Sequence, residues 1–270
     1  MVLRSLVHQR NIIRNANHQF YKFSNKIAVF DSIIDQRRSV RKFLKDDVID
    51  DNIMKKMLQH AQKSPSSFNL QPYKGIVVRD IEQKMALSET MLGIGNIDRV
   101  KDAAMTIVFL ADKKPTRNTK KLMKLEMDAG KNPEYVHSLP AKMSFLAGNG
   151  VVAMKIKQAA THLLSPLKGM PIVEPVDNWS TKNTVIAAQT LMLSAAAHGY
   201  ASCPMEGFDA RRLAYLLNIP LEDYSIPLVV SVGLEDVEAE AALNKQDNAN
   251  IRTRYPLEDV FFSNEYGEKL

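Results

Sequence analysis

The chain has 270 residues, of which 45% are hydrophobic and 24% are charged, so it can bury a sizeable core and is neither a disordered nor a fibrous protein. Its formal net charge of +6 is concentrated in residues 1–30, which hold five basic residues and no acid. The rest of the chain is nearly neutral, which gives little support for binding nucleic acid. Cys203 is the only cysteine, which excludes an intrachain disulfide and favours a reducing compartment.

We predict a basic N-terminal extension over residues 1–30 and a single domain over residues 31–270. Two interpretations of the extension stay open. It is either a basic arm or partner-packing helix of a cytoplasmic protein, or an Arg-rich, acid-free mitochondrial transit segment. The longest apolar run, residues 184–201, is interrupted by polar residues and is shorter than the ~20 residues that cross a bilayer. It therefore predicts a buried core helix and no stable membrane insertion.

In chain order, the domain is expected to begin with two helices, each capped by an acidic residue. Asp31 is expected to cap a helix over residues 32–38, and Asp50 a helix over residues 51–62. A turn-rich loop is then expected at residues 64–74 and a strand at 75–79. A helix at 81–92 and a second strand at 105–111 follow.

Residues 112–182 are expected to form excursions over a site, with helices at 119–130 and 150–164 and a loop at 169–179. A long helix is expected from about Lys182, with Gly199 as the residue that ends it. A strand and turn are expected at residues 200–209, followed by a helix at 210–218 that Asp209 caps. A strong strand at 225–233 and a weakly structured polar segment at 234–250 are the last expected elements. This irregular alternation of helices and strands favours mixed α and β layers around one sheet.

Most common catalytic and metal-binding motifs are absent from the sequence. The six histidines are scattered without metal-ligand spacing, so no metal centre is expected. The segment "GIGNID" at 93–98 has Asp98 where a dinucleotide-binding motif has its third glycine. There is also no phosphate-binding P-loop and no G-x-S-x-G nucleophile motif.

The remaining candidate is an arginine cluster, "RRSVRK" at 37–42. Two N–H groups of one arginine guanidinium can donate to two oxygens of the same phosphate, and a serine hydroxyl adds a further donor, so this pattern favours a terminal phosphate. The alternative is a solvated charged surface, which is what most runs of charge are. A second basic pair, Arg252 and Arg254, follows near the C-terminus. The loop "SPSSFNLQP" offers hydroxyl and amide groups that suit a flat polar heterocycle, or it is an ordinary turn.

Four stretches in this order, "RRSVRKF", "SPSSFNLQPYK", "CPMEGFD" and "RTRYP", resemble the FMN-dependent nitroreductase family, of the oxygen-insensitive NAD(P)H nitroreductase and dihydropteridine reductase type. The resemblance covers residues 31–262. It implies an α+β fold with a central, mostly antiparallel sheet flanked by helices, in a homodimer with two FMN sites at its shared interface. The loop "SPSSFNLQP" would reach the flavin from the partner subunit.

The resemblance also implies the residues that bind the cofactor. The phosphate, ribityl chain and pyrimidine edge would be bound by Arg37, Arg38, Ser39 and Arg41, with Arg252 and Arg254 on the phosphate. The partner's loop would supply Pro65, Ser66, Ser67 and Asn69. The turn beside flavin N5 would be Pro204, Met205, Glu206 and Gly207, and the polar edge of the flavin would contact Asn96 and Arg99.

In this family the flavin carries the chemistry, so no protein residue is expected to act as acid, base or nucleophile. NADH or NADPH would donate hydride and a nitroaromatic, quinone or related acceptor would take it, by a ping-pong mechanism. Arg41 is the candidate to stabilise the reduced ring, and Glu206 is expected to position the flavin. Phe68, Tyr73, Phe145 and Trp179 are candidates to stack on substrate, although aromatic residues are more often core.

Three alternatives stay open. One is a flavin-binding protein with a sensing or storage role. Another is a flavin-dependent reductive dehalogenase-like enzyme of the same fold, since the iodotyrosine dehalogenases share the R-R-S-x-R motif. The third is a module that binds nucleic acid or an anionic membrane through the basic N-terminal extension.

Overall fold

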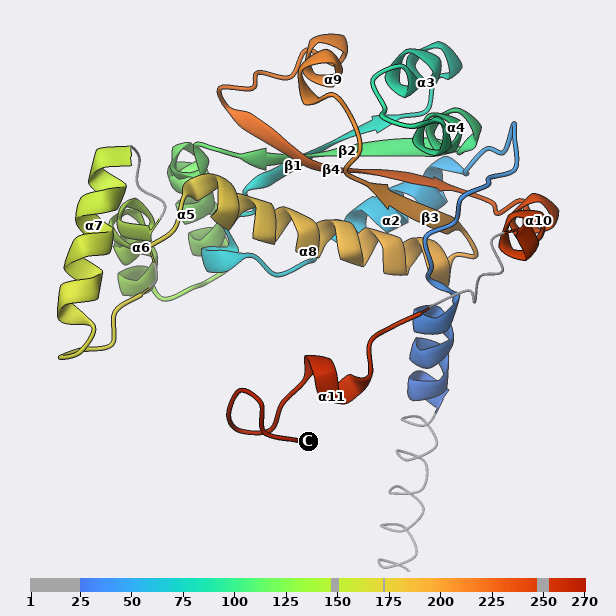
Figure 1. Ribbon diagram of the computed structural model, residues 1–270. Coiled ribbons are helices and arrows are strands. Elements are labelled where there is room, and N and C mark those ends of the chain that lie inside the picture. The colour runs from blue at the N-terminus through green and yellow to red at the C-terminus, as the bar shows by residue number, and fades with distance from the viewer. Residues whose placement is uncertain (1–24, 147–150, 172, 247–252) are drawn as a thin grey trace, which may run out of the picture.

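A four-stranded antiparallel sheet forms the centre of the protein. The computed structural model describes residues 25–146, 151–171, 173–246 and 253–270 (Figure 1). The strands are β1 (Tyr73–Val78), β2 (Met105–Asp112), β3 (Ala201–Met205) and β4 (Tyr224–Gly233). Their order in the sheet is β1-β2-β4-β3, and every neighbouring pair is antiparallel. The predicted α+β fold with an antiparallel sheet is therefore confirmed.

Helices cover both faces of this sheet (Figure 1). One face carries α2 (Asp51–Gln62) and α8 (Val176–Ala197), and the other carries α3 (Ile81–Ser88), α4 (Ile94–Asp102) and α9 (Ala210–Leu216). The strands supply both layers because successive side chains point to opposite faces of a sheet. On β2, Ile107 packs toward α2 and α8, whereas Val108 packs toward the other three helices. This alternation gives two apolar cores with the sheet between them.

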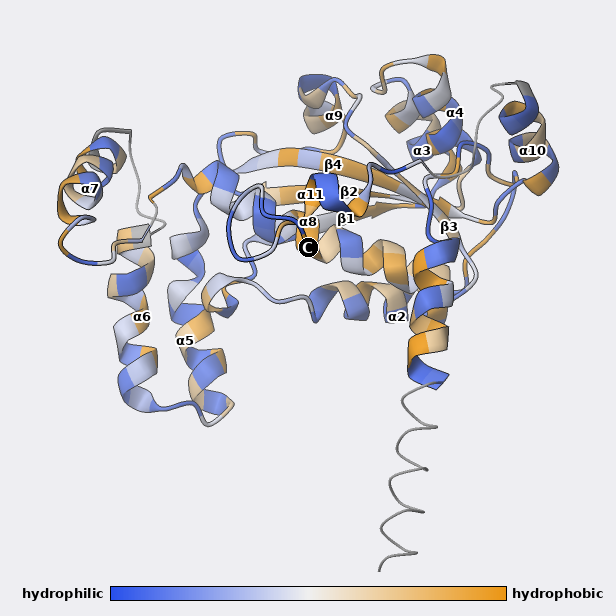
Figure 2. Ribbon diagram, turned by 60° about the horizontal axis from the view of Figure 1, so that its bottom comes forward, coloured by the Kyte–Doolittle hydropathy of each residue, from blue (hydrophilic) through white to orange (hydrophobic). Residues whose placement is uncertain are grey.

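Three further helices extend beyond one end of the sheet: α5 (Thr119–Asp128), α6 (Pro133–Leu146) and α7 (Val151–Leu164) (Figures 1 and 2). The first two join the body through a separate apolar cluster, in which Leu122 and Leu139 pack with Trp179. Trp179 is thus a core residue and not a candidate for stacking on substrate. The remaining short elements are η1 (Ser67–Asn69), η2 (Pro115–Asn118) and α11 (Leu257–Val260).

The expected helix ends are confirmed where a side chain caps the helix. The Asp50 carboxylate accepts from the backbone N–H of Asn52 at 2.8 Å, and Asp209 accepts from that of Arg211 at 3.0 Å. Gly199 ends α8 with a φ of +81°, which glycine adopts without the steric penalty of a Cβ atom.

Other expectations about the elements are wrong. Asp31 lies inside a helix over residues 25–36 instead of capping one, and this helix runs across position 30. The long helix α8 begins at Val176, six residues before the expected start near Lys182. Helices α4, α6 and α10 (Val237–Gln246) form where no helix was expected. These helices are stabilised by tertiary contacts or by capping residues, which the helix propensity of their own residues does not predict.

Among the described glycines, Gly233 is one where an added side chain would meet backbone. A Cβ atom there would lie 2.9 Å from the backbone nitrogen of Ala104. We expect Gly233→Ala to lower the free energy of unfolding by about 1–3 kcal/mol, because a backbone atom cannot move aside cheaply. Gly75→Ala is the matched control in β1, since its Cβ would meet only Ile107 at an ordinary 3.6 Å. Equal urea midpoints for the two variants would contradict the expectation.

Within the described residues, no helix is both long and apolar enough to cross a bilayer. The same residues contain no group of three His, Cys, Asp or Glu side chains placed to hold a metal ion.

Candidate functional site

The arginine segment runs beside the edge strand β3. Ser39 forms an isolated parallel bridge with Ser202, and the backbone N–H of Val40 donates to the Ser202 carbonyl at 3.2 Å. The side chains of Val40 and Phe43 are buried in the core and fix the segment in place. Ser39, between these anchors and the helix before them, is exposed. The extended backbone therefore presents its polar residues at the surface beside β3.

Carboxylates of the C-terminal part of the chain pair with these arginines. Arg38 forms an ion pair with Glu235, and its Nη1 lies 3.6 Å from Oε1 of Glu240. The Nε of Arg41 donates to the same Oε1 at 3.3 Å, and its Nη2 donates to Asn244 Oδ1 at 2.7 Å. The guanidinium groups are thus held in fixed directions before any ligand binds.

Glu240 is the buried centre of this network, with its side chain only 3% exposed. Its Oε2 accepts from two successive backbone N–H groups, of Arg41 at 2.8 Å and of Lys42 at 3.0 Å. A buried carboxylate is stable only when hydrogen-bond donors and opposite charge surround it, and here both are present. Sequence reasoning missed Glu240, because its helix α10 was expected to be weakly structured.

A second group of predicted residues meets at the turn after β3. The Nδ2 of Asn96 donates to the carbonyls of Leu92 at 3.0 Å and of Gly207 at 3.3 Å. The Oδ1 of Asn96 accepts from Nη1 of Arg99. The structure therefore brings Asn96 and Arg99 of α4 together with Gly207 of the "CPMEGFD" turn.

The arginine segment and the group of Asn96, Arg99 and Gly207 lie next to each other around β3. Lys42 Nζ donates to Asp98 Oδ2 at 3.1 Å, which ties the arginine segment to α4. Burial raises the pKa of the Cys203 thiol; the positive charge of Arg99 acts to lower that pKa and the negative charge of Glu240 to raise it. Both charged groups therefore lie near Cys203, a buried residue whose raised pKa makes it a structural thiol and not a reactive one.

The turn itself, residues 204–207, combines a buried anchor with an exposed acid. Met205 is buried in the core, whereas Glu206 is exposed. The Phe208 N–H donates to the Glu206 carbonyl at 3.1 Å, and the Asp209 N–H donates to Thr90 at 2.7 Å. These backbone hydrogen bonds fix the turn, and Glu206 lies at the surface of it.

The donors around β3 suit FMN. Guanidinium groups and the exposed Ser39 hydroxyl match the phosphate and the oxygens of the ribityl chain. The Nε of Arg99 is buried and makes no hydrogen bond within the described residues, so the site holds a donor whose hydrogen-bonding capacity is unused. Gly207 packs closely against α4, since a Cβ there would lie 2.7 Å from Asn96 Nδ2.

Gly207→Ala is expected to weaken FMN binding by about tenfold, because the new methyl group displaces the Asn96 amide from its two carbonyl partners. Fluorescence titration of FMN-free protein measures this change. Gly169→Ala is the control, since a Cβ there would meet nothing within 4 Å. Unchanged FMN affinity in Gly207→Ala would remove this turn from the site.

The loop "SPSSFNLQP" is rigid and lies elsewhere in the protomer. The Ser66 hydroxyl accepts from the Gln71 N–H at 2.9 Å, and the Ser67 N–H donates to Asn183 Oδ1 at 2.9 Å. The Asn69 side chain donates to the buried Glu126 at 2.6 Å. Phe68 and Asn69 both have a φ of +56°, a strained conformation that these contacts maintain. The exposed Pro65 begins the loop.

One protomer does not bring this loop to the arginine segment. The loop lies against α5 and α8 at one end of the sheet, whereas the arginine segment lies near α10 at the other end (Figure 1). Arg254 is exposed on the C-terminal tail, where its Nη1 donates to the carbonyl of Thr253 at 2.7 Å. Arg252 lies outside the described residues.

The other aromatic candidates lie near the loop or on α6. Phe68 packs partly buried against the cluster around Trp179, and Phe145 on α6 is 39% exposed. The hydroxyl of Tyr73 lies 3.5 Å from the Gln62 carbonyl, and burial raises its pKa.

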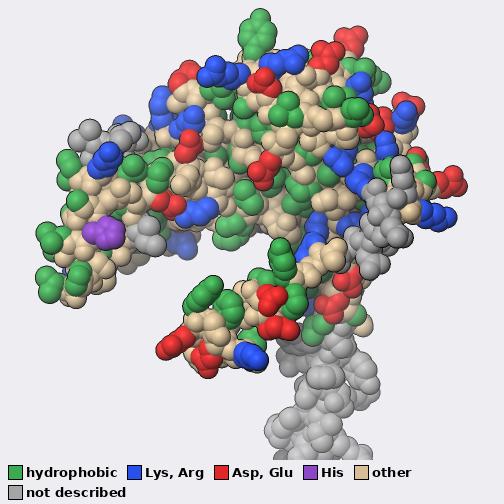
Figure 3. All heavy atoms as spheres, in the orientation of Figure 1, with side chains coloured by type: hydrophobic (Ala, Val, Ile, Leu, Met, Phe, Trp, Pro, Cys, Tyr) green, Lys and Arg blue, Asp and Glu red, His purple; other side chains and the backbone are tan. Residues whose placement is uncertain are grey.

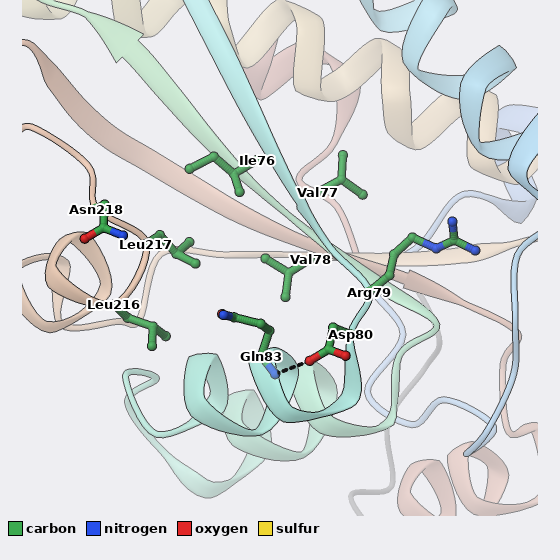
Figure 4. Close-up of a pocket in the computed structure, with 9 residues that line it drawn as sticks. All are labelled: Ile76, Val77, Val78, Arg79, Asp80, Gln83, Leu216, Leu217 and Asn218. Carbon is green, nitrogen blue, oxygen red and sulfur yellow. Dashed lines mark hydrogen bonds between the residues drawn. The ribbon is translucent and has the colours of Figure 1, made fainter.

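Two pockets of the described residues lie away from the residues around β3. One, of about 390 Å³, lies between β1, α3 and α9, where Asp80 caps α3 through the Gln83 N–H (Figure 4). It contains none of the predicted site residues. Another, of about 550 Å³, lies between the loop and α5 and includes Asn69 and Gln71. Neither of these two pockets joins the arginine segment to the loop.

The fold and these motifs define a family of oxidoreductases. The Nitroreductase family model matches residues 34–234, so the chain belongs to the nitroreductase family. The predicted family is thereby confirmed, and the match includes three of the four motifs, since "RTRYP" lies after residue 234.

Curated relatives and solved structures agree with this family. The chain is 29% identical to protein DrgA of Synechocystis over 234 residues, 84% of this chain and 92% of that protein. It is 28% identical to an NADH dehydrogenase of Thermus thermophilus over 198 residues, 73% of this chain and 82% of that protein. A protein of Exiguobacterium sibiricum crystallised in complex with FMN has the same fold, with a TM-score of 0.64, 21% identity, and coverage of 86% of this chain and 95% of that one.

Proposed function

We propose that the protein is an FMN-dependent oxidoreductase that moves hydride from NADH or NADPH to nitroaromatic, quinone or related electrophilic acceptors. Its membership of the nitroreductase family supports the flavin and the nicotinamide donor. The observation that carries the proposal is the convergence around β3 of the arginine segment, the Asn96–Arg99 pair and the residue 204–207 turn. When bound, FMN supplies the hydride acceptor and donor of the reaction.

The residues of the chain bind and orient the groups that react. Arg37 and Ser39 would hold the phosphate together with Arg252 and Arg254. Arg41, held in direction by Glu240, would place positive charge beside the pyrimidine edge and favour the reduced, anionic form of the ring. Glu206 would position the ring at the turn. Donor and acceptor would bind in turn at one place, which predicts ping-pong kinetics.

We also propose that the protein acts as a homodimer with both sites at the interface. The loop at 65–69 and the arginine segment lie at opposite ends of one protomer, so a second copy is needed to bring them together (Figure 1). The helix at 25–36 and the C-terminal tail stand off the body with exposed apolar side chains, including Phe30 and Phe261. Such side chains gain stability when another surface covers them.

The test is an absorbance spectrum of the purified protein, followed by anaerobic addition of NADH and, separately, NADPH. We expect flavin bands that bleach within seconds and identify the preferred donor. Protein that stays colourless and takes up no added FMN would overturn the proposal. Protein that holds FMN but turns over slowly with every acceptor would instead support a flavin-binding role.

Light scattering tests the dimer separately. A dimer that persists on dilution is the expected result. A monomer that retains stoichiometric FMN would contradict a site shared between subunits, while leaving the flavin chemistry intact.

A further inference from the structure

Helix α7 has its apolar side chains on the outside. Ile156 is 65% exposed and Leu163 is 78% exposed, and they lie seven residues apart on one face of the helix. Leu167, in the turn that follows, is 86% exposed. Leu164 is also exposed. Figure 3 shows hydrophobic side chains at the outer edge of the molecule, where α7 lies. We call Ile156, Leu163, Leu164 and Leu167 the α7 surface.

Polar residues and the half-buried Met154 attach α7 to the protein. Gln158 donates to the Val173 carbonyl at 2.9 Å, and Lys157 donates to the carbonyls of Ser144 at 2.7 Å and Phe145 at 3.1 Å. Thr161 is also buried. A surface helix ordinarily turns its apolar residues to the core, whereas Ile156, Leu163 and Leu164 of α7 are exposed. The α7 surface is therefore available to something outside the protomer.

The segment that carries this surface has basic residues and, between Glu134 and Glu174, no acidic ones. Residues 135–173 contain four lysines and no Asp or Glu, in a chain that is otherwise nearly neutral after residue 30. Lys155 on α7 and Lys168 just after it are both exposed and accompany the apolar side chains. An occupant of this surface must accept apolar side chains and several positive charges at the same time.

We propose that the α7 surface binds an anionic lipid bilayer, with its apolar side chains at the boundary of headgroups and acyl chains and its lysines against lipid phosphates. Lysine beside leucine is favoured on helices that lie in a membrane interface, because the long side chain reaches the headgroups. The centres of protein–protein interfaces are instead depleted of lysine. The helix also projects beyond the sheet, where a flat surface can reach it (Figures 1 and 2). This association lies on the membrane and does not span it.

The experiment is co-sedimentation of the full, FMN-loaded protein with vesicles of phosphatidylcholine, alone and mixed with phosphatidylglycerol. We expect binding to the mixed vesicles only, and weaker binding as salt increases. The double variant Leu163→Glu, Leu167→Glu is expected to bind at least about tenfold more weakly, because two apolar contacts are lost and two negative charges are added. Replacing Lys155 and Lys168 by Gln is expected to weaken binding by about tenfold.

Ile81→Glu is the matched control, because Ile81 is a 69% exposed apolar residue at the start of α3, on another part of the protein. It is expected to bind vesicles as the unchanged protein does. Circular dichroism and flavin content verify that each variant is folded. Binding that is absent in the unchanged protein, or equal in the leucine double variant and Ile81→Glu, would overturn the proposal.

Two other occupants are outcomes of the same experiment. If the leucine double variant dissociates the oligomer in light scattering, the α7 surface is an interface between subunits and the proposal fails. The basic N-terminal extension also carries positive charge, so Arg4, Arg10 and Arg14 are replaced by Gln in the full chain. Vesicle binding that depends only on these arginines would assign the membrane contact to the extension and overturn the role of α7.

Discussion

The double variant Arg37→Ala, Arg254→Ala is expected to remain folded and to lose FMN on dialysis. Each charge-assisted hydrogen bond from an arginine to a phosphate contributes about 1.5–3 kcal/mol, so losing both raises the FMN dissociation constant by about 150- to 25,000-fold. The two residues come from segments that are far apart in the sequence. Both are expected to bind the same phosphate, so both substitutions weaken FMN binding. Flavin absorbance after dialysis and fluorescence titration measure the loss.

Arg211→Ala, Arg212→Ala is the matched control for this change. Both are exposed arginines at the start of α9, and only their backbone N–H groups bond to the capping Asp209. Removing their side chains alters net charge by the same amount and is expected to leave FMN bound. If the Arg37, Arg254 variant keeps stoichiometric flavin, these arginines do not bind the phosphate.

The variant Glu240→Ala is expected to lower the free energy of unfolding by about 3–5 kcal/mol. The change removes a buried carboxylate that accepts from two backbone N–H groups and lies beside two guanidinium groups. Breaking a buried ion pair by removing one partner costs this much, because the opposite charge loses its compensation. Urea unfolding, measured on FMN-free protein, gives the value without a contribution from the ligand.

Glu238→Ala is the control, since Glu238 is an exposed acid two residues away on the same helix. It is expected to change the free energy of unfolding by no more than about 0.5 kcal/mol. Glu240→Gln keeps the shape of the side chain and separates charge from packing. Similar stabilities for Glu240→Ala and Glu238→Ala would mean that the carboxylate does not hold α10 against the arginine segment.

The candidate site residues could be proposed from the sequence because their motifs are short and local. The segment "RRSVRK" contains its own donors, and "CPMEGFD" contains its own turn. The partners that orient these donors were not predictable, since Glu240 lies 199 residues from Arg41. Nothing in the composition of residues 234–250 distinguishes a helix held by a buried ion pair from a solvated polar segment.

Local pattern was sufficient for the strands and for the helix ends that a side chain caps. The apolar runs of β2 and β4 and the caps at Asp50 and Asp209 depend only on neighbours along the chain. Contacts between distant segments decided the rest. They set the order of the strands, the pairing of Arg38 with Glu235, and the separation of the loop at 65–69 from the arginine segment within one protomer. A pairing between two charged residues far apart in the sequence depends on how the chain folds, so neither segment alone carries a signal that names its partner.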